Sequence, residues 1–136
     1  MDAARRTIEF TNAVLAGLAR DGRDLVVHLQ GVVVRDRGSV DVPATVLRQD
    51  AEVRIANATV VGEQPVYAQI VTASVWLVGE ARHRDAVPLP QIHRGAVRIH
   101  FECGDGARLA LRGAGVTVLL RGTQVALTGS DERRTH

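Results

Sequence analysis

The sequence predicts an all-β fold, an antiparallel β-sandwich or a flattened small barrel of about eight to ten strands with bent corner strands. Val alone occurs twenty-one times, and β-branched side chains favour strands over helices. Three stretches also repeat one pattern, an apolar strand followed by Asn-Ala or Gly-Ala, at 8–15, 53–60 and 109–116. Because Asn and Gly best tolerate left-handed backbone angles, we expect a strand to bend or change sheet at Asn12, Asn57 and Gly113.

The first segment, residues 7–19, fits either a helix or a bent strand followed by a hairpin. The Asp21-Gly22 pair favours the hairpin, because Asp-Gly between two apolar runs is a strong signal for a two-residue turn. The return strand, Asp24–Val34, alternates between apolar and mixed positions, and Gly31 is a predicted bulge. The mixed positions are predicted to face outward: Asp24, Val26, His28 and Gln30.

The middle of the chain predicts three further strands. Val40–Leu47 is a short strand whose Pro43 indicates an edge or a bulge, and Val53–Val61 is the second bent strand. Tyr67–Val78 is long, apolar and β-branched, so we expect a central strand buried on both faces, with a buried helix as the alternative.

The last third begins with Ala81–Gly95, where two prolines and many charges predict the longest irregular stretch. Val97–Cys103 then alternates, with Ile99 and Phe101 on its apolar side. A turn near residues 104–106 leads into the third bent strand, and strands at 116–120 and 124–127 complete the fold. The alternation predicts these buried residues: Leu25, Val27, Leu29, Ile55, Ile99, Phe101, Leu109, Leu111, Val116 and Val118.

Length and composition predict one domain over residues 1–129 and a polar tail over 130–136. A single cysteine excludes an intramolecular disulfide framework, and we expect a cytoplasmic protein. The longest uncharged run, Gln64–Gly79, is shorter than a spanning helix and contains several polar residues, so no membrane segment is expected. All seventeen basic residues are Arg, but they are interleaved with acids and the net charge is only +2, so nucleic acid is not an expected partner.

The candidate catalytic residues are Arg98, His100 and Glu102. Spacing of two on a strand places their side chains on one face, where a carboxylate and a guanidinium could assist a histidine base. A polar outer stripe on a half-buried strand gives the same alternation. The candidate ligand-binding residues are His28, Tyr67 and Trp76.

No metal site or cofactor is expected. His100 and Cys103 are separated by an odd number of residues, so a regular strand directs them to opposite faces, and no fourth ligand is evident beside His93. Gly113-Ala-Gly115 lacks the third glycine of a dinucleotide fingerprint and leads into a strand.

The sequence therefore predicts a non-catalytic binding or protein-interaction module of unknown specificity. One alternative is a small β-barrel enzyme, of cyclase or isomerase type, that acts on an apolar small molecule through His100 and Glu102. Another is a structural subunit of a homo-oligomer, because long apolar strands without a single Lys leave edges to be covered. The expected partners are a second copy of the chain and a small apolar ligand or a protein.

Overall fold

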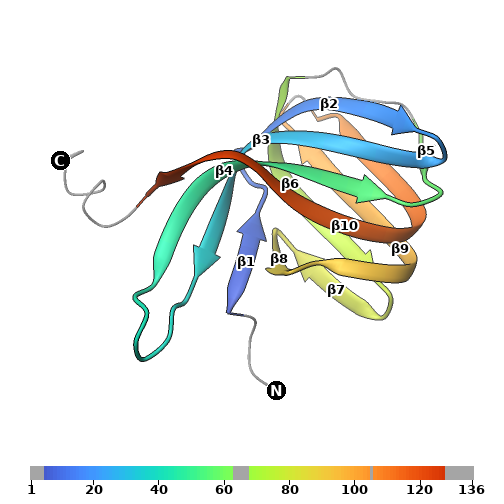
Figure 1. The fold of residues 1–136 in the computed structure, drawn as a ribbon. Coiled ribbons are helices and arrows are strands. Elements are labelled where there is room, and N and C mark those ends of the chain that lie inside the picture. The colour runs from blue at the N-terminus through green and yellow to red at the C-terminus, as the bar shows by residue number, and fades with distance from the viewer. Residues whose placement is uncertain (1–4, 63–67, 105, 128–136) are drawn as a thin grey trace.

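The computed structural model describes residues 5–62, 68–104 and 106–127, and antiparallel strands with their connecting loops build this region (Figure 1). These residues contain no helix, and hence none that could cross a membrane. The strands are β1 (Arg6–Glu9), β2 (Val14–Asp21), β3 (Asp24–Asp36), β4 (Thr45–Ile55), β5 (Thr59–Val61), β6 (Gln69–Val78), β7 (Ala81–Arg84), β8 (Ala86–Leu89), β9 (Ile92–Cys103) and β10 (Arg108–Ala126).

Six of the strands form a closed ring in the order β2-β6-β9-β10-β4-β3, and the β2–β3 hairpin completes it. The junction between β2 and β6 is short, with only Val14 opposite Ile70 and Leu15 opposite Gln69. Outside the ring, β1 pairs with β3 and β8, β5 pairs with β10, and β7 pairs with β6. The prediction of an all-β sandwich or flattened barrel is confirmed.

The first two predicted corners are confirmed. Residues 7–19 form β1 and β2 rather than a helix, and between them Asn12 has a φ of 73°. Its N–H donates to the carbonyl of Val71 at 2.7 Å, which ties the corner to β6. Asn57 has a φ of 47° between β4 and β5. Both corners therefore use the left-handed region that Asn tolerates.

At the third predicted corner, β10 continues through Gly113 as one strand of 19 residues, without a left-handed angle but with a bulge in its pairing to β9 between Gly113 and Gly115. Gly113 is required there for a different reason. A Cβ atom at this position would lie 2.4 Å from Ile55 Cγ2 and 2.6 Å from the Ala56 carbonyl oxygen. The glycine thus permits a close approach between β10 and the end of β4, beside a bulge in the β9–β10 pairing.

The predicted hairpin between β2 and β3 exists, but its central residues are shifted by one. Asp21 pairs with Asp24, so the loop consists of Gly22 and Arg23. Gly22 has a φ of 63° at the first central position, which is typical of a type II′ turn rather than the Asp-Gly turn expected. The predicted bulge at Gly31 is confirmed by a φ of 75° and a register shift between Leu29 and Val32.

The prediction that Ala81–Gly95 is irregular is wrong. It contains β7, β8 and the start of β9 at Ile92. Pro88 is tolerated because β8 is an edge strand, paired only with β1, so its missing N–H removes no bond from a second neighbour. Between β7 and β8, Asp85 has a φ of 64°, and its carboxylate accepts a hydrogen bond from the N–H of Ser74 at 2.9 Å.

Two strands differ from expectation in extent or burial. The strand predicted for Val40–Leu47 begins only at Thr45 and continues without a break to Ile55. The strand predicted for Tyr67–Val78 runs from Gln69, and it is buried on one face rather than two. Its inner residue Trp76 is fully buried, whereas the outer Ile70 and Leu77 are 51% and 38% exposed. A long apolar run therefore does not by itself predict burial on both faces.

The core lies inside the ring. Nine of the ten predicted core residues are buried, and Val118 is half-buried against them. Three aromatic rings occupy the centre: Phe10 stacks on Trp76 with centroids 5.2 Å apart, and Phe101 meets both edge-on at 5.3 and 6.2 Å. Val26, predicted to face outward, is buried at 6% exposure. Arg98, His100 and Glu102 lie on the opposite side of β9 from this core, as predicted.

Candidate functional site

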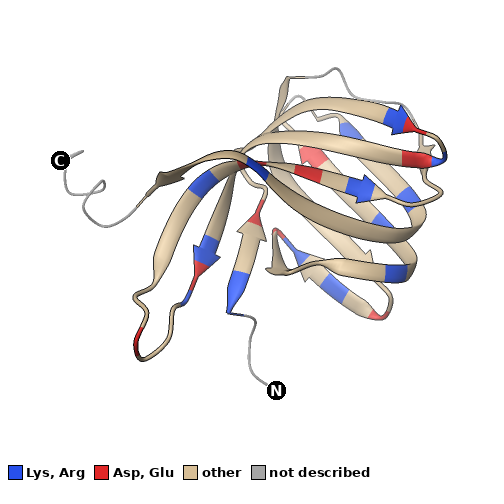
Figure 2. Cartoon of the chain, viewed as in Figure 1, with Lys and Arg blue, Asp and Glu red and all other residues tan. Residues whose placement is uncertain are grey.

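The outer surface of β7, β6, β9 and β10 carries five arginines, which we call the arginine face: Arg82, Arg84, Arg98, Arg108 and Arg112. The strand register places them together. Arg82 lies opposite Leu77, Leu77 opposite Arg98, and Arg98 opposite Arg112. Residues directly opposite in an antiparallel pair point to the same side of the sheet. Figure 2 shows basic positions on several strands of this wall.

Alternation with the core fixes the direction of these side chains. On β9, Val97, Ile99 and Phe101 are buried, so the intervening residues face outward. On β10, Leu109 and Leu111 are buried, which turns Arg108 and Arg112 to the same outer surface. Because the core takes the intervening apolar residues, Arg98 and Glu102 on β9 and Arg108 and Arg112 on β10 face the solvent.

None of the five arginines makes an ion pair or a side-chain hydrogen bond within the described part of the chain. All five are exposed. Arg98 and Arg112 lie directly opposite each other on neighbouring strands, and like charges in that arrangement destabilise a sheet. The face therefore holds a local excess of positive charge that the overall charge of +2 does not reveal.

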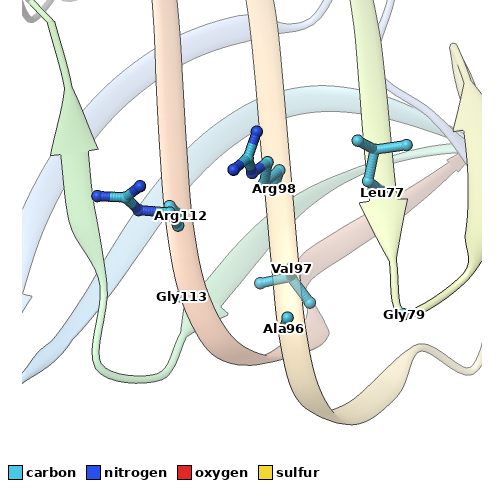
Figure 3. A pocket seen from close by; sticks show the side chains of 7 residues that line it. All are labelled: Leu77, Gly79, Ala96, Val97, Arg98, Arg112 and Gly113. Carbon is cyan, nitrogen blue, oxygen red and sulfur yellow. The ribbon is translucent and has the colours of Figure 1, made fainter.

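Hollows on this face meet at the Arg98–Arg112 pair. One, of about 270 Å³, is lined by Leu77, Gly79, Ala96, Val97, Arg98, Arg112 and Gly113 (Figure 3). A second, of about 220 Å³, is lined by Val61, Arg98, His100, Leu111 and Arg112. In Figure 3 the two arginines stand on adjacent strands, with Leu77 on the far side of Arg98. Arg98 and Arg112 thus line both hollows.

A third hollow, of about 130 Å³, lies where β6, β7 and β9 meet. It is lined by Ala73, Ser74, Val75, Arg84, His100 and Glu102. Burial lowers the pKa of His100, and the positive charges of Arg108 and Arg98 lower it further, while Glu102 acts in the opposite direction. His100 is therefore neutral at neutral pH, since its ordinary pKa is 6.5.

The predicted catalytic residues share one face, and His100 and Glu102 line one hollow. The predicted ligand-binding residues do not join them. His28 lies on β3, three strands away from β9 in the ring, with its Nδ1 3.8 Å from Glu52 Oε1. Trp76 is fully buried in the core. Tyr67 lies outside the described residues.

The sequence prediction missed four members of the arginine face: Arg82, Arg84, Arg108 and Arg112. A signal for the two on β10 is present in the sequence. A hairpin that turns at 104–106 pairs residue 102 with 108, and the same register continues to Arg98 opposite Arg112. The two on β7 could not be found in this way, because their strand was expected to be irregular.

Metal ligands do not gather in this structure: the described residues contain no group of three or more His, Cys, Asp or Glu side chains that could hold an ion. Cys103 is buried at 3% exposure. No protein-family model, no curated protein and no solved structure matches this chain.

Proposed function

We propose that this protein is a non-catalytic binding module that holds an anionic ligand on its arginine face. One observation carries the proposal: Arg98 and Arg112 oppose each other across two strands, and neither has an acidic partner in the described residues. A bound anion would turn this repulsion into attraction. Guanidinium groups are suited to this role because their planar, permanently charged fork matches carboxylate, sulfate and phosphate groups.

The apolar composition of the rest of the face limits what the ligand can be. Phe10, Trp76 and Phe101 all lie in the core, so none of these rings is available to stack on a nucleobase. The hollows beside the arginines instead contain aliphatic side chains, Leu77 in one and Val61 in the other. The arrangement favours an anionic group with an aliphatic neighbour over a nucleic acid.

Binding of a simple polyanion tests the proposal. Low-molecular-weight dextran sulfate, immobilised on a sensor surface, should capture the wild-type protein at low ionic strength and release it as salt is added. The double variant Arg98→Gln/Arg112→Gln should bind about tenfold more weakly or worse, with a shallower dependence on salt.

The matched control is Arg48→Gln/Arg121→Gln, which removes the same charge from β4 and the far end of β10. Its affinity should stay within about twofold of wild type, because surface charges away from the ligand contribute only through the screened field. Equal losses in the two double variants would show attraction to net charge alone, and the proposed site would then be wrong.

A small enzyme is the second candidate, because the hollow of about 130 Å³ brings His100 and Glu102 together with Ser74 and Arg84. Its test is turnover rather than affinity. Small carbonyl compounds incubated with the protein and followed by NMR should be converted by the wild type, and not by His100→Gln or Glu102→Gln. Binding at the arginine face without any conversion would favour the binding module.

A further inference from the structure

We propose that Arg98 and Arg112 form a clamp for a single phosphate monoester dianion, carried by a small organic molecule whose carbon part lies against Leu77. This inference rests on the proposed function and names the chemistry of its ligand. The site is the hollow of about 270 Å³ between β6, β9 and β10 (Figure 3).

The strand register brings the two forks within reach of one group. Arg98 and Arg112 are direct partners across β9 and β10, where opposed Cβ atoms are about 4.5–5.5 Å apart. Both side chains are long and exposed, and neither is held by a carboxylate in the described residues. Both are therefore free to turn toward an anion placed between them.

Charge and oxygen count select a phosphoryl group over a carboxylate. Two guanidinium groups contribute two positive charges, and no acidic residue lines either hollow that they share. A phosphate monoester carries about −1.5 to −2 charges at neutral pH and offers three terminal oxygens, enough for both forks. A carboxylate carries one charge and two oxygens, which a single Arg already satisfies.

The floor of the hollow limits the size of the carbon part. Gly79, Ala96 and Gly113 leave the space open, while Leu77 supplies an aliphatic wall that is 38% exposed. The volume of about 270 Å³ lies just below the usual range for ligand sites, about 300–1,000 Å³. A phosphoryl group with a short carbon chain fits this space, whereas a large polymer could place only its end there.

Amide NMR titrations of the full chain at low salt test the clamp with three probes: n-butyl phosphate, inorganic phosphate and pentanoate. Butyl phosphate should bind about tenfold more tightly than pentanoate, because only the phosphoryl group satisfies both forks. It should also bind more tightly than inorganic phosphate, through contact with Leu77. The largest shifts should occur at 77, 98, 112 and 113.

Two single variants and a control locate the binding energy. Arg98→Gln and Arg112→Gln should each weaken the binding of butyl phosphate about tenfold. Arg98→Lys should recover only part of the lost affinity, because an ammonium is a point charge. Arg48→Gln, an exposed arginine on β4, should bind within about twofold of wild type. Affinity should fall between pH 7.5 and pH 5, since the second pKa of the monoester is about 6.

Four outcomes would overturn the inference. Equal affinity for pentanoate and butyl phosphate would show that the site does not select a dianion. Unchanged affinity in Arg98→Gln would show that Arg98 does not hold the phosphoryl group. Tighter binding of a phosphoserine peptide than of butyl phosphate would reassign the face to a protein partner. Capture by dextran sulfate without any binding of butyl phosphate would leave the proposed function standing and reject the clamp alone.

Discussion

Two sides of this molecule use arginine in opposite ways. On the side built by β1, β3, β4 and the second half of β10, four arginines contact carboxylates: Arg54 of β4 meets Asp21 at the end of β2 at 2.9 Å, Arg121 meets Glu52 and Arg5 meets Asp36 at 3.0 Å, and Arg35 meets Glu9. We call this the paired side. On the arginine face, five arginines have no such partner in the described residues. The residue type is the same, but only the second group has charge left to offer a ligand.

The pKa shifts follow the same division. On the paired side, hydrogen bonding to Asp21 raises the pKa of Arg54, and a hydrogen bond from Arg5 lowers the pKa of Asp36. In both of these pairs, each charge stabilises that of its partner. On the arginine face, burial and the surrounding cations lower the pKa of His100. The surrounding charges thus disfavour a further positive charge there and favour a bound anion.

The shared core sets the scale of stability on which both sides depend. Phe101 is fully buried and contacts both Phe10 and Trp76, so Phe101→Ala should lower the free energy of unfolding by about 3–5 kcal/mol. Urea unfolding measures this change. Leu119→Ala, at a position 36% exposed, is the control and should cost far less. Similar losses in the two variants would mean that the aromatic cluster is not the centre of the core.

The corner at Asn57 carries the chain from the paired side to β5, at the edge of the arginine face. Because its φ is 47°, Asn57→Val should cost about 1–2 kcal/mol through left-handed strain. Asn57→Gly keeps the backbone conformation accessible and should cost much less, although it also loses the asparagine side chain. Thermal or urea unfolding of both variants checks the order, and equal costs would indicate that the side chain matters rather than the backbone angle.

Neutralising one arginine on each side tests the comparison directly. Arg54→Gln should lower the melting temperature, because it leaves Asp21 and Asp24 facing each other without their shared cation. Arg98→Gln should raise the free energy of unfolding by about 0.2–0.5 kcal/mol at low salt, because it relieves repulsion with Arg112.

The pairwise origin of that gain can be isolated with a double-mutant cycle. Arg98→Gln and Arg112→Gln should each raise the free energy of unfolding. The increase in the double variant should be smaller than the sum of the two single increases, since either change removes the same repulsion. Added salt should shrink the effect. Additive gains would show that each arginine is strained by the general field rather than by its opposite neighbour.

The smallest effect concerns pH. Because the pKa of His100 in the folded protein lies below its ordinary 6.5, the unfolded chain binds a proton first as the pH falls. The stabilising contribution of the neutral imidazole is therefore complete above about pH 6.5 and declines as the pH falls through that value. The difference in stability between wild type and His100→Gln should change in this window. NMR titration of His100 gives the midpoint directly, and a midpoint above 6.5 would contradict a repulsive field.

The fold was predictable where local chemistry and side-chain period agree. Asn12 and Asn57 marked corners because the backbone there needs a left-handed angle, and the alternation of Val97–Cys103 identified the buried side of β9. The prediction of a left-handed angle at Gly113 failed because a glycine required by close packing against Ile55 looks the same in a sequence as one required by a turn. Pro88 contributed to the wrong prediction of an irregular stretch. The energetic cost of a proline in a strand depends on whether that strand has one neighbouring strand or two.

The candidate site was predictable only along single strands. Spacing of two brought Arg98, His100 and Glu102 to one face, which needs no knowledge of other strands. The arginine face depends on register between strands, which sets Arg112 against Arg98 and Arg82 against Leu77. It also depends on which arginines form ion pairs with carboxylates, and the even mixture of Arg and acidic residues along the chain conceals that difference.

One strand has a consequence for how the chain is made. β10 supplies the neighbour of both β9 and β4, yet it is the last strand of the described chain. Until it is synthesised, the ring cannot close, and β4 and β9 each keep an open edge that invites pairing with other chains. At about 5–20 residues per second, its 19 residues take about 1–4 seconds to translate. Closure of the ring therefore waits for the whole of β10, and a ribosome that stalls within β10 would leave a chain prone to aggregate.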